Sequence, residues 1–312
     1  MRFITKRIKN KNYFYAEHSF RLPNGKIKVL SKRVNSKTEL PKDYFQKKEV
    51  ESYQKYAQSF YVTDSIYTEK KIADLEECRV GFKYLKNKLT KKQFEDILHR
   101  FTVNCTYETN AIEGNSLTLK DVTLFLGEKI VPKNRNLREI YETRNTHQAH
   151  TSLFERKFAI CKKDILKIHS IIVKDMDIHM GFKQLPNYLL MRSVKTTPPE
   201  KVESEIDSLV EWYNKKVHEK WHPLKIATHF HAKFEKIHPF EDGNGRVGRI
   251  LLNVILFQFG YPPLIIRKTM KEKYFTCLAA ADNNSFSQLE YLLISKFKKT
   301  YSHFFEEYVK YV

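Results

Sequence analysis

The residue types best suited to chemistry gather in one short segment, residues 238–249, which reads His-Pro-Phe-Glu-Asp-Gly-Asn-Gly-Arg-Val-Gly-Arg. Its glycines leave backbone N–H groups free at the mouth of a helix, where the helix dipole is positive, and such a nest binds anions, phosphate above all. Arg246 and Arg249 are three residues apart and therefore share a face of the first helical turn. A cation at a helix N-terminus costs about 0.3–1 kcal/mol, so two of them beside an anion nest predict a bound polyanion.

Two further side chains of the segment complete a reaction site. Asp242 offers hard oxygen ligands beside the phosphate nest, which suits Mg²⁺ shared with phosphate oxygens. His238 ends the preceding helix and faces the same turn, and an imidazole with an ordinary pKa of about 6.5 is a usable general base near neutral pH. Phe240, between them, is predicted to be an apolar anchor that buries the loop.

Other interpretations of the segment explain less. Gly243, Gly245 and Gly248 match the spacing of a dinucleotide-binding loop, but a helix precedes them instead of a strand. About 20 residues further on, where that fingerprint needs an acid, the chain has Arg267 and Lys268. A purely structural turn would explain the glycines and a buried histidine, but not an aspartate and two arginines together.

The segment resembles the signature of the Fic family, HPFx(D/E)GNGRxxR, with every fixed position present. The similarity extends upstream to His231 and downstream through 251–253, 260–263, Arg267, 273–274 and Leu278, so it covers roughly residues 100–290. The resemblance implies a protein adenylyltransferase that moves AMP from Mg-ATP onto a Ser, Thr or Tyr hydroxyl of a protein, including itself. It also leaves a homodimer open.

The resemblance assigns a role to each position of the segment. His238 would take the proton from the target hydroxyl, and Asp242 would hold Mg²⁺, the implied cofactor, between the phosphates of ATP. The other residues implied to bind the nucleotide are an anion hole and two phosphate-gripping arginines, namely Gly243, Asn244, Gly245, Arg246 and Arg249.

A second motif lies far upstream. Thr109-Asn-Ala-Ile-Glu113-Gly114 resembles the inhibitory motif of the family, (S/T)xxxE(G/N). On a helix Thr109 and Glu113 are i and i+4 and project to one side, and Gly114 would stop that helix. The physical reason for inhibition would be charge mimicry, because Glu113 could form a bidentate pair with Arg249 and deny it to the γ-phosphate.

The family docks its target along a β-hairpin flap by strand addition. Here the flap is expected within 184–197, with Tyr188, Leu189, Leu190, Met191 and Arg192 as its strand. The chain departs from the family pattern there, because Lys183 replaces an arginine and Pro186 interrupts the first strand. For adenine the resemblance points to Tyr274, Phe275 and Asp282, although Tyr274 and Phe275 could equally be core residues.

The elements that must position these residues are mostly helices. Apolar residues recur every three or four positions from about Glu49 onward, and a helix is predicted to start at Pro223 with His231 and His238 on one stripe. Aromatic and β-branched runs around Asn24-Gly25 predict a hairpin before that. The expected fold class is mainly α, a Fic-type helical bundle with a β-hairpin flap and an N-terminal β-hairpin extension.

We expect four parts along the chain. They are an N-terminal extension with a β-hairpin, a helical region carrying the inhibitory motif, a Fic catalytic core and a C-terminal helix, over residues 1–48, 49–155, 156–290 and 291–312.

The composition of the chain limits which kinds of partner are expected. The 312 residues are 41% hydrophobic, without a membrane span or a signal peptide, so a cytoplasmic protein is expected. The net charge of +20 invites a nucleic-acid interpretation. Lysine dominates the basic residues and A/T-rich codons explain much of that excess, so nucleic acid is not the favoured partner.

Three alternatives stay open beside the leading hypothesis of an autoinhibited adenylyltransferase. The same fold could transfer another nucleotide, or could remove AMP when Glu113 orients a water. From a different class, the chain could be a non-catalytic, basic nucleic-acid-binding regulator.

Overall fold

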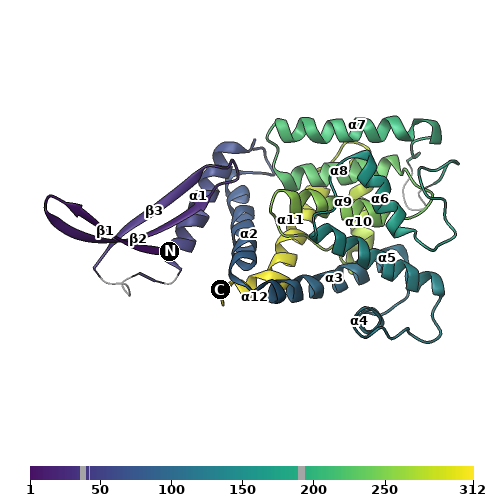
Figure 1. Cartoon of the computed structure of the whole chain (residues 1–312). Helices are drawn as coiled ribbons and strands as arrows, with labels where there is room; N and C mark the ends of the chain where they lie inside the picture. Colours follow the sequence, from purple (N-terminus) through teal and green to yellow (C-terminus); the bar gives the residue numbers. More distant parts are fainter. Residues whose placement is uncertain (36–39, 42, 189–193) are drawn as a thin grey trace. The chain divides into compact units, whose positions relative to one another are not determined.

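The computed structural model describes residues 1–35, 40–41, 43–188 and 194–312 (Figure 1). It is mainly helical, with a small antiparallel sheet at the N-terminus, as the sequence predicts. The chain consists of two compact units, residues 1–80 and residues 81–312. The four-part division expected from the sequence stays a prediction.

The N-terminal unit carries the sheet, in the order β1-β2-β3, the helix α1 and the first part of α2. Its elements are β1 (Arg2–Ile8), β2 (Lys11–Arg21), β3 (Ile27–Val34) and α1 (Tyr44–Phe60). The predicted hairpin is β2 and β3, which turn at Gly25 in the left-handed region (φ 83°). The strand β1 was not predicted, because it turns through Lys9 and Asn10, both with positive φ, and lacks the Asn-Gly signal.

The C-terminal unit is a helical assembly. The helix α2 (Glu69–Lys88) crosses from one unit to the next. The other elements, in chain order, are α3 (Lys91–Glu113), α4 (Leu119–Glu128), α5 (Leu137–Phe154), α6 (Lys162–Ile172), α7 (Pro199–His218), α8 (Pro223–Ile237), α9 (Asn244–Gln258), η1 (Lys268–Met270), α10 (Lys271–Asp282), α11 (Ser287–Tyr301), the π-helical turn η2 (Ser302–Glu306) and α12 (Glu307–Val309).

The helix α9 lies at the centre of this unit, and α3, α5, α6 and α8 all pack against it (Figure 1). Its residues are buried from Asn244 to Phe257 with the single exception of Gly245, which is half-buried. A helix that is buried all round has a fixed position, so the residues of its first turn are held by the core. None of the described helices has the length and apolar character needed to cross a bilayer.

Candidate active site

The backbone of His238 leaves the helix abruptly. His238 caps α8 with φ 52° and ψ 61°, and its N–H donates to Phe234 O at 3.0 Å. This left-handed conformation costs a non-glycine residue about 1–2 kcal/mol, and Pro239 cannot continue the helix. The strained residue is the predicted base, and such strain collects at functional sites.

The loop after His238 is anchored in the core. Phe240 is fully buried, as predicted, and its ring stacks on His169 with centroids 3.8 Å apart. The amide of Asn244 binds both the N–H and the carbonyl of Phe240 at 2.8 Å. Burial lowers the pKa of His169 to about 4. Its Nε2 lies 3.2 Å from Asp242 O, and this hydrogen bond raises the pKa but is outweighed by burial. The loop is therefore held by neutral, packed groups.

Gly243 begins α9 in the left-handed conformation, with φ 82°. This conformation favours glycine, and a Cβ there would also lie in tight contact with Ile172, at 3.0 Å. The side chain of Asn244 is occupied by Phe240, so Asn244 can offer an anion only its backbone N–H, together with that of Gly245. The anion-hole assignment stays a prediction.

Arg246 and Arg249 project from the first turns of α9 into buried surroundings, with 2% and 6% exposure. Arg246 lies 3.2 Å from Asp242 Oδ1 and 3.4 Å from Glu142 Oε1. Its buried Nε has no hydrogen-bond acceptor in the described part of the chain. A buried guanidinium with an unsatisfied donor beside an anion nest fits a phosphate group.

Asp242 is surrounded by positive charge. Burial raises the pKa of its carboxyl, but the charges of Arg246 and Arg138 and the N–H of Gly243 outweigh burial, and the net pKa is lowered. The carboxylate is thus ionised and about one third exposed. Over the described residues no group of three or more His, Cys, Asp or Glu gathers around a metal position. One carboxylate fits Mg²⁺, which usually takes one or two carboxylates and leaves its other positions to phosphate and water.

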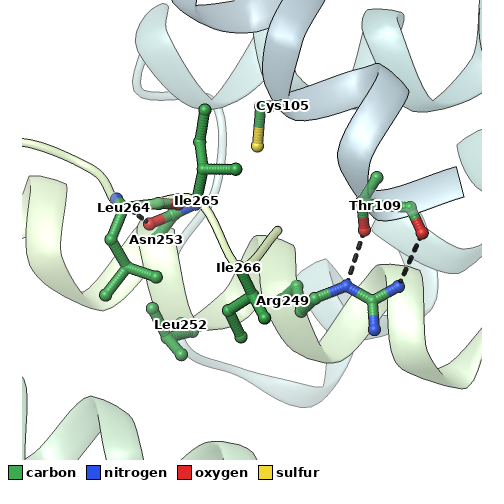
Figure 2. Close-up of a pocket in the computed structure, with 8 residues that line it drawn as sticks. All are labelled: Cys105, Thr109, Arg249, Leu252, Asn253, Leu264, Ile265 and Ile266. Carbon is green, nitrogen blue, oxygen red and sulfur yellow. Dashed lines mark hydrogen bonds between the residues drawn. The ribbon is translucent and has the colours of Figure 1, made fainter. Parts of the chain in front are cut away.

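The upstream motif meets the site at Arg249. Arg249 Nε donates to Thr109 Oγ1 at 2.6 Å and Nη2 donates to Thr109 O at 3.1 Å (Figure 2). Nη2 also donates to Glu113 Oε1 at 2.5 Å. The predicted bidentate pair is therefore wrong in detail, because Thr109 takes one edge of the guanidinium and Glu113 makes a single bond. Burial lowers the pKa of Arg249, but the charges of Glu113, Tyr274 and Glu235 and the hydrogen bond to Glu113 together outweigh burial, and the net pKa is raised.

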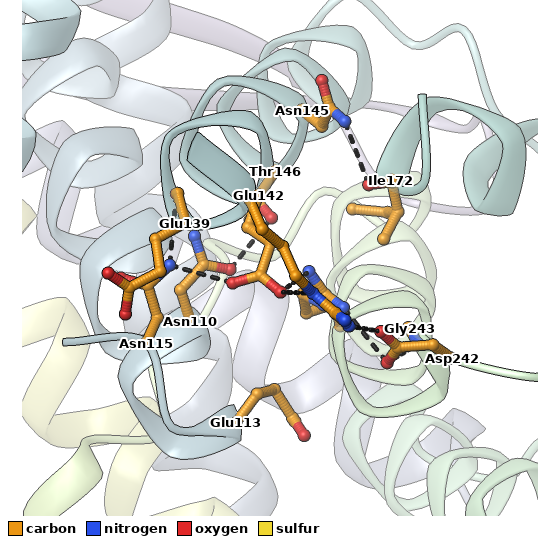
Figure 3. A network of polar contacts seen from close by, with 12 residues as sticks. Asn110, Glu113, Asn115, Glu139, Glu142, Asn145, Thr146, Ile172, Asp242 and Gly243 are labelled. Carbon is orange, nitrogen blue, oxygen red and sulfur yellow. Dashed lines mark hydrogen bonds and ion pairs between the residues drawn. The ribbon is translucent and has the colours of Figure 1, made fainter. Parts of the chain in front are cut away.

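The helix α3 presents these two residues because it ends where the motif predicts. Gly114 caps α3 in the left-handed region, with φ 106°. Glu113 lies over the start of α9, so that a Cβ on Gly245 would collide with its carboxylate (Figure 3). The glutamate therefore occupies the space above the nest.

The base of the expected flap is tied to the loop of His238. Lys183 is 3% exposed and its Nζ donates to Asn187 Oδ1 at 2.7 Å and to Thr196 Oγ1 at 3.0 Å. Asn187 donates in turn to Phe240 O at 2.8 Å. Burial lowers the pKa of Lys183 to about 8.

Tyr188 forms an antiparallel bridge with Lys195 and is 82% exposed, which is the pattern of a hairpin base. The other residues predicted for the flap strand lie outside the described residues, namely Leu189, Leu190, Met191 and Arg192.

The residues predicted for adenine differ in access. Tyr274 is fully buried and its hydroxyl lies 2.6 Å from His231 Nε2, while Asp282 is 7% exposed. Phe275 is half-buried and has the most accessible side chain of the three. Their role in binding adenine stays a prediction.

Sequence reasoning missed four residues that the fold brings to the site: His169, Lys183, Glu142 and Arg138. Lys183 was noted only as a departure from the family. Arg138 could have been noticed, because a cation in the first turn of a helix is unfavourable.

Comparisons with known proteins agree with this geometry. The model of the Fic/DOC family matches residues 159–256. The protein adenylyltransferase Fic of Nematostella vectensis is 29% identical over 57% of this chain and 42% of its own length. The protein of the same name from Aedes aegypti is 30% identical over 56% of this chain and 36% of its own length. The chain thus spans less than half of these relatives.

Solved structures show the same fold. A Fic domain containing signaling protein from Bacteroides thetaiotaomicron has a TM-score of 0.66 at 24% identity, covering 73% of this chain and 94% of that one. A Fic family protein from Desulfovibrio desulfuricans has a TM-score of 0.65 at 24% identity, over 78% of this chain and 75% of that one. The chain therefore carries a Fic domain over residues 159–256.

Proposed function

We propose that this chain is an autoinhibited protein adenylyltransferase, which transfers AMP from Mg-ATP to a hydroxyl side chain of a protein, itself included. The observation that carries the proposal is the buried guanidinium of Arg246, whose Nε has no acceptor among the described residues, at the glycine-lined start of α9. The names of the relatives from Nematostella vectensis and Aedes aegypti support the same activity.

The reaction follows from the groups around that nest. His238 caps α8 directly before the turn, where its imidazole would take the proton of the target hydroxyl. The hydroxyl oxygen then bonds to the α-phosphorus, the bond from that phosphorus to the bridging oxygen of the β-phosphate breaks, and pyrophosphate leaves. A positioned base contributes about 10²–10⁴-fold.

The two arginines stabilise the charge of the phosphates. Both are buried, so their interaction with an anion is less screened than it would be in water. Asp242 would hold Mg²⁺, which as a Lewis acid would neutralise phosphate charge. The residues at the foot of the flap are hydrogen-bonded to the loop of His238. A target strand bound to the flap would therefore lie next to His238, the proposed general base.

Glu113 would act as the brake, because it holds Arg249 and lies over Gly245. A hydrogen bond to a charged group is worth about 1.5–3 kcal/mol, which would slow turnover about 10- to 150-fold. The carboxylate also occupies space above the nest, so a bound triphosphate would be misplaced as well.

The test is the intact mass of three proteins after incubation with Mg-ATP: wild type, Glu113→Gly and Glu113→Gly/His238→Ala. We expect AMP adducts to form much faster on Glu113→Gly than on wild type, and not at all on the double variant. Equal rates for wild type and Glu113→Gly would remove the brake, and an adduct on the double variant would remove the role of His238.

Parallel incubations distinguish the neighbouring possibilities. GTP, UTP and CTP in place of ATP show whether another nucleotide is the better donor. Adding pre-modified protein to wild type shows whether AMP is removed. A mobility shift with random DNA that weakens steeply with salt would support a nucleic-acid regulator instead.

A further inference from the structure

Four charged side chains form a closed ring beside the nest. Arg138 Nη2 donates to Asp242 Oδ2 at 2.5 Å, and Arg246 Nη2 donates to Asp242 Oδ1 at 3.2 Å. Glu142 Oε1 closes the ring, at 3.4 Å from both Arg138 Nε and Arg246 Nη1 (Figure 3). Positive and negative charges alternate around the ring, and both oxygens of Asp242 are engaged.

The two arginines differ in freedom. The side chain of Arg246 is 2% exposed and comes from the central helix, so it stays where it is. The side chain of Arg138 is 57% exposed and can swing into solvent without breaking the core. Glu142 is 12% exposed and also accepts from Asn115 Nδ2 at 2.9 Å, so it is fixed independently of Arg138.

The position of Arg138 is unfavourable for its own helix. It is the second residue of α5, where the helix dipole disfavours a cation. Its stabilising partners are the carboxylates of the ring, and Asp242 is 104 residues away in the sequence. The contact with Asp242 therefore joins α5 to the residue that would hold the metal.

We propose that Arg138 is a positioning residue that holds the carboxylate of Asp242 until a divalent cation displaces it, and so sets the cation concentration at which the site loads. This inference rests on the proposed function, because Asp242 is the expected metal ligand. The positive guanidinium on Oδ2 takes one of that oxygen's two lone pairs and repels an arriving cation, so the two compete for the carboxylate. Oδ1 would keep its bonds to Gly243 N–H and Arg246 throughout.

The test compares Arg138→Gln with the parent in the Glu113→Gly background. ATP binding is measured by titration calorimetry at a series of Mg²⁺ concentrations. A part-exposed ion pair is worth little, so we expect the Mg²⁺ concentration for half-maximal ATP binding to fall about two- to fivefold. The ATP affinity at saturating Mg²⁺ should be unchanged. Arg138→Lys keeps the positive charge but loses the planar, two-pronged guanidinium. Its Mg²⁺ concentration for half-maximal ATP binding should lie between those of the parent and Arg138→Gln.

The matched control is Arg144→Gln. Arg144 lies on the same helix and pairs with Asp175 at 2.7 Å, outside the ring, so its loss should leave the Mg²⁺ dependence unchanged. If Arg138→Gln and Arg144→Gln needed the same Mg²⁺ concentration for half-maximal ATP binding, this inference would be overturned and the proposed function would stand. Weaker ATP binding by Arg138→Gln at saturating Mg²⁺ would also overturn it and make Arg138 a phosphate ligand. If the Glu113→Gly parent bound no ATP at any Mg²⁺ concentration, the proposed function itself would fail.

Discussion

At the scale of single residues, the guanidinium of Arg249 is the group for which α3 and a nucleotide would compete. Within the described residues it donates three hydrogen bonds to α3, and one of these goes to Glu113. Thr109 supplies the other two, through its hydroxyl and its carbonyl. The threonine of the motif is thus more than a helix residue, because it fixes the edge of the guanidinium that carries Nε.

Replacing Thr109 by valine should therefore release part of the brake. The change removes a charge-assisted hydrogen bond of 2.6 Å and keeps the shape of a side chain that is 4% exposed. We expect self-modification about three- to tenfold faster than wild type, but slower than for Glu113→Gly, measured as the rate of AMP adduct formation.

Thr106→Val is the matched control. Thr106 lies one turn earlier on α3, is fully buried, and its hydroxyl has no hydrogen-bond partner among the described residues. Its replacement should leave the rate at the wild-type value. A Thr109→Val rate no higher than that of Thr106→Val would show that the hydroxyl plays no part in inhibition.

At the scale of elements, the ends of three helices meet at the site. The cap of α8 supplies His238, the start of α9 supplies the nest, and the end of α3 supplies Glu113. Helix ends are where backbone groups remain unpaired, and so where anions and charged side chains bind. The stop of α3 at Gly114 matters most for the brake, since it makes Glu113 the last residue of the helix, with its carboxylate next to Gly245.

Gly114→Ala should destabilise the C-terminal unit. Its φ of 106° lies in the left-handed region, so a side chain there costs about 1–2 kcal/mol, and the free energy of unfolding should fall by that amount. Gly127→Ala is the opposite control, because Gly127 lies inside α4 with open space around it. Alanine should raise stability there by up to about 0.5–1 kcal/mol.

Urea unfolding measures both glycine changes. Equal effects of the two substitutions would show that the strained cap of α3 does not determine the stability of its end.

At the scale of the whole molecule, buried neutral histidines limit stability in acid. Burial lowers the pKa of His147 to about 4, of His150 to about 3 and of His169 to about 4. In the unfolded chain each would be protonated below about 6.5. The unfolded state thus binds more protons, so the stability is complete above pH 6.5 and is lost as the pH falls from 6.5 towards 4.

At pH 5.5 each of these histidines should cost about 1.4 kcal/mol relative to neutral pH. The measurement is the free energy of unfolding in urea at pH 7.5 and pH 5.5. In His150→Gln the loss of unfolding free energy between pH 7.5 and pH 5.5 should be smaller by about 1.4 kcal/mol, because the glutamine amide does not titrate. An unchanged drop in His150→Gln would contradict the assignment.

The sequence alone determined the parts of the site that are local in the chain. The turn between α8 and α9 follows from Pro239, Gly243 and the free N–H groups of a helix start, and these depend on neighbouring residues only. Helical spacing likewise put Thr109 and Glu113 on one side of α3. Neither needs knowledge of the fold.

Only the tertiary structure decided which distant groups surround that turn. Arg138 reaches Asp242, His169 stacks on Phe240, and Lys183 ties the base of the flap to the loop. These contacts join elements far apart in the chain, and their existence depends on how α5 and α6 pack on α9. Sequence spacing fixes what one helix presents, whereas packing of several helices around a shared core fixes what it meets.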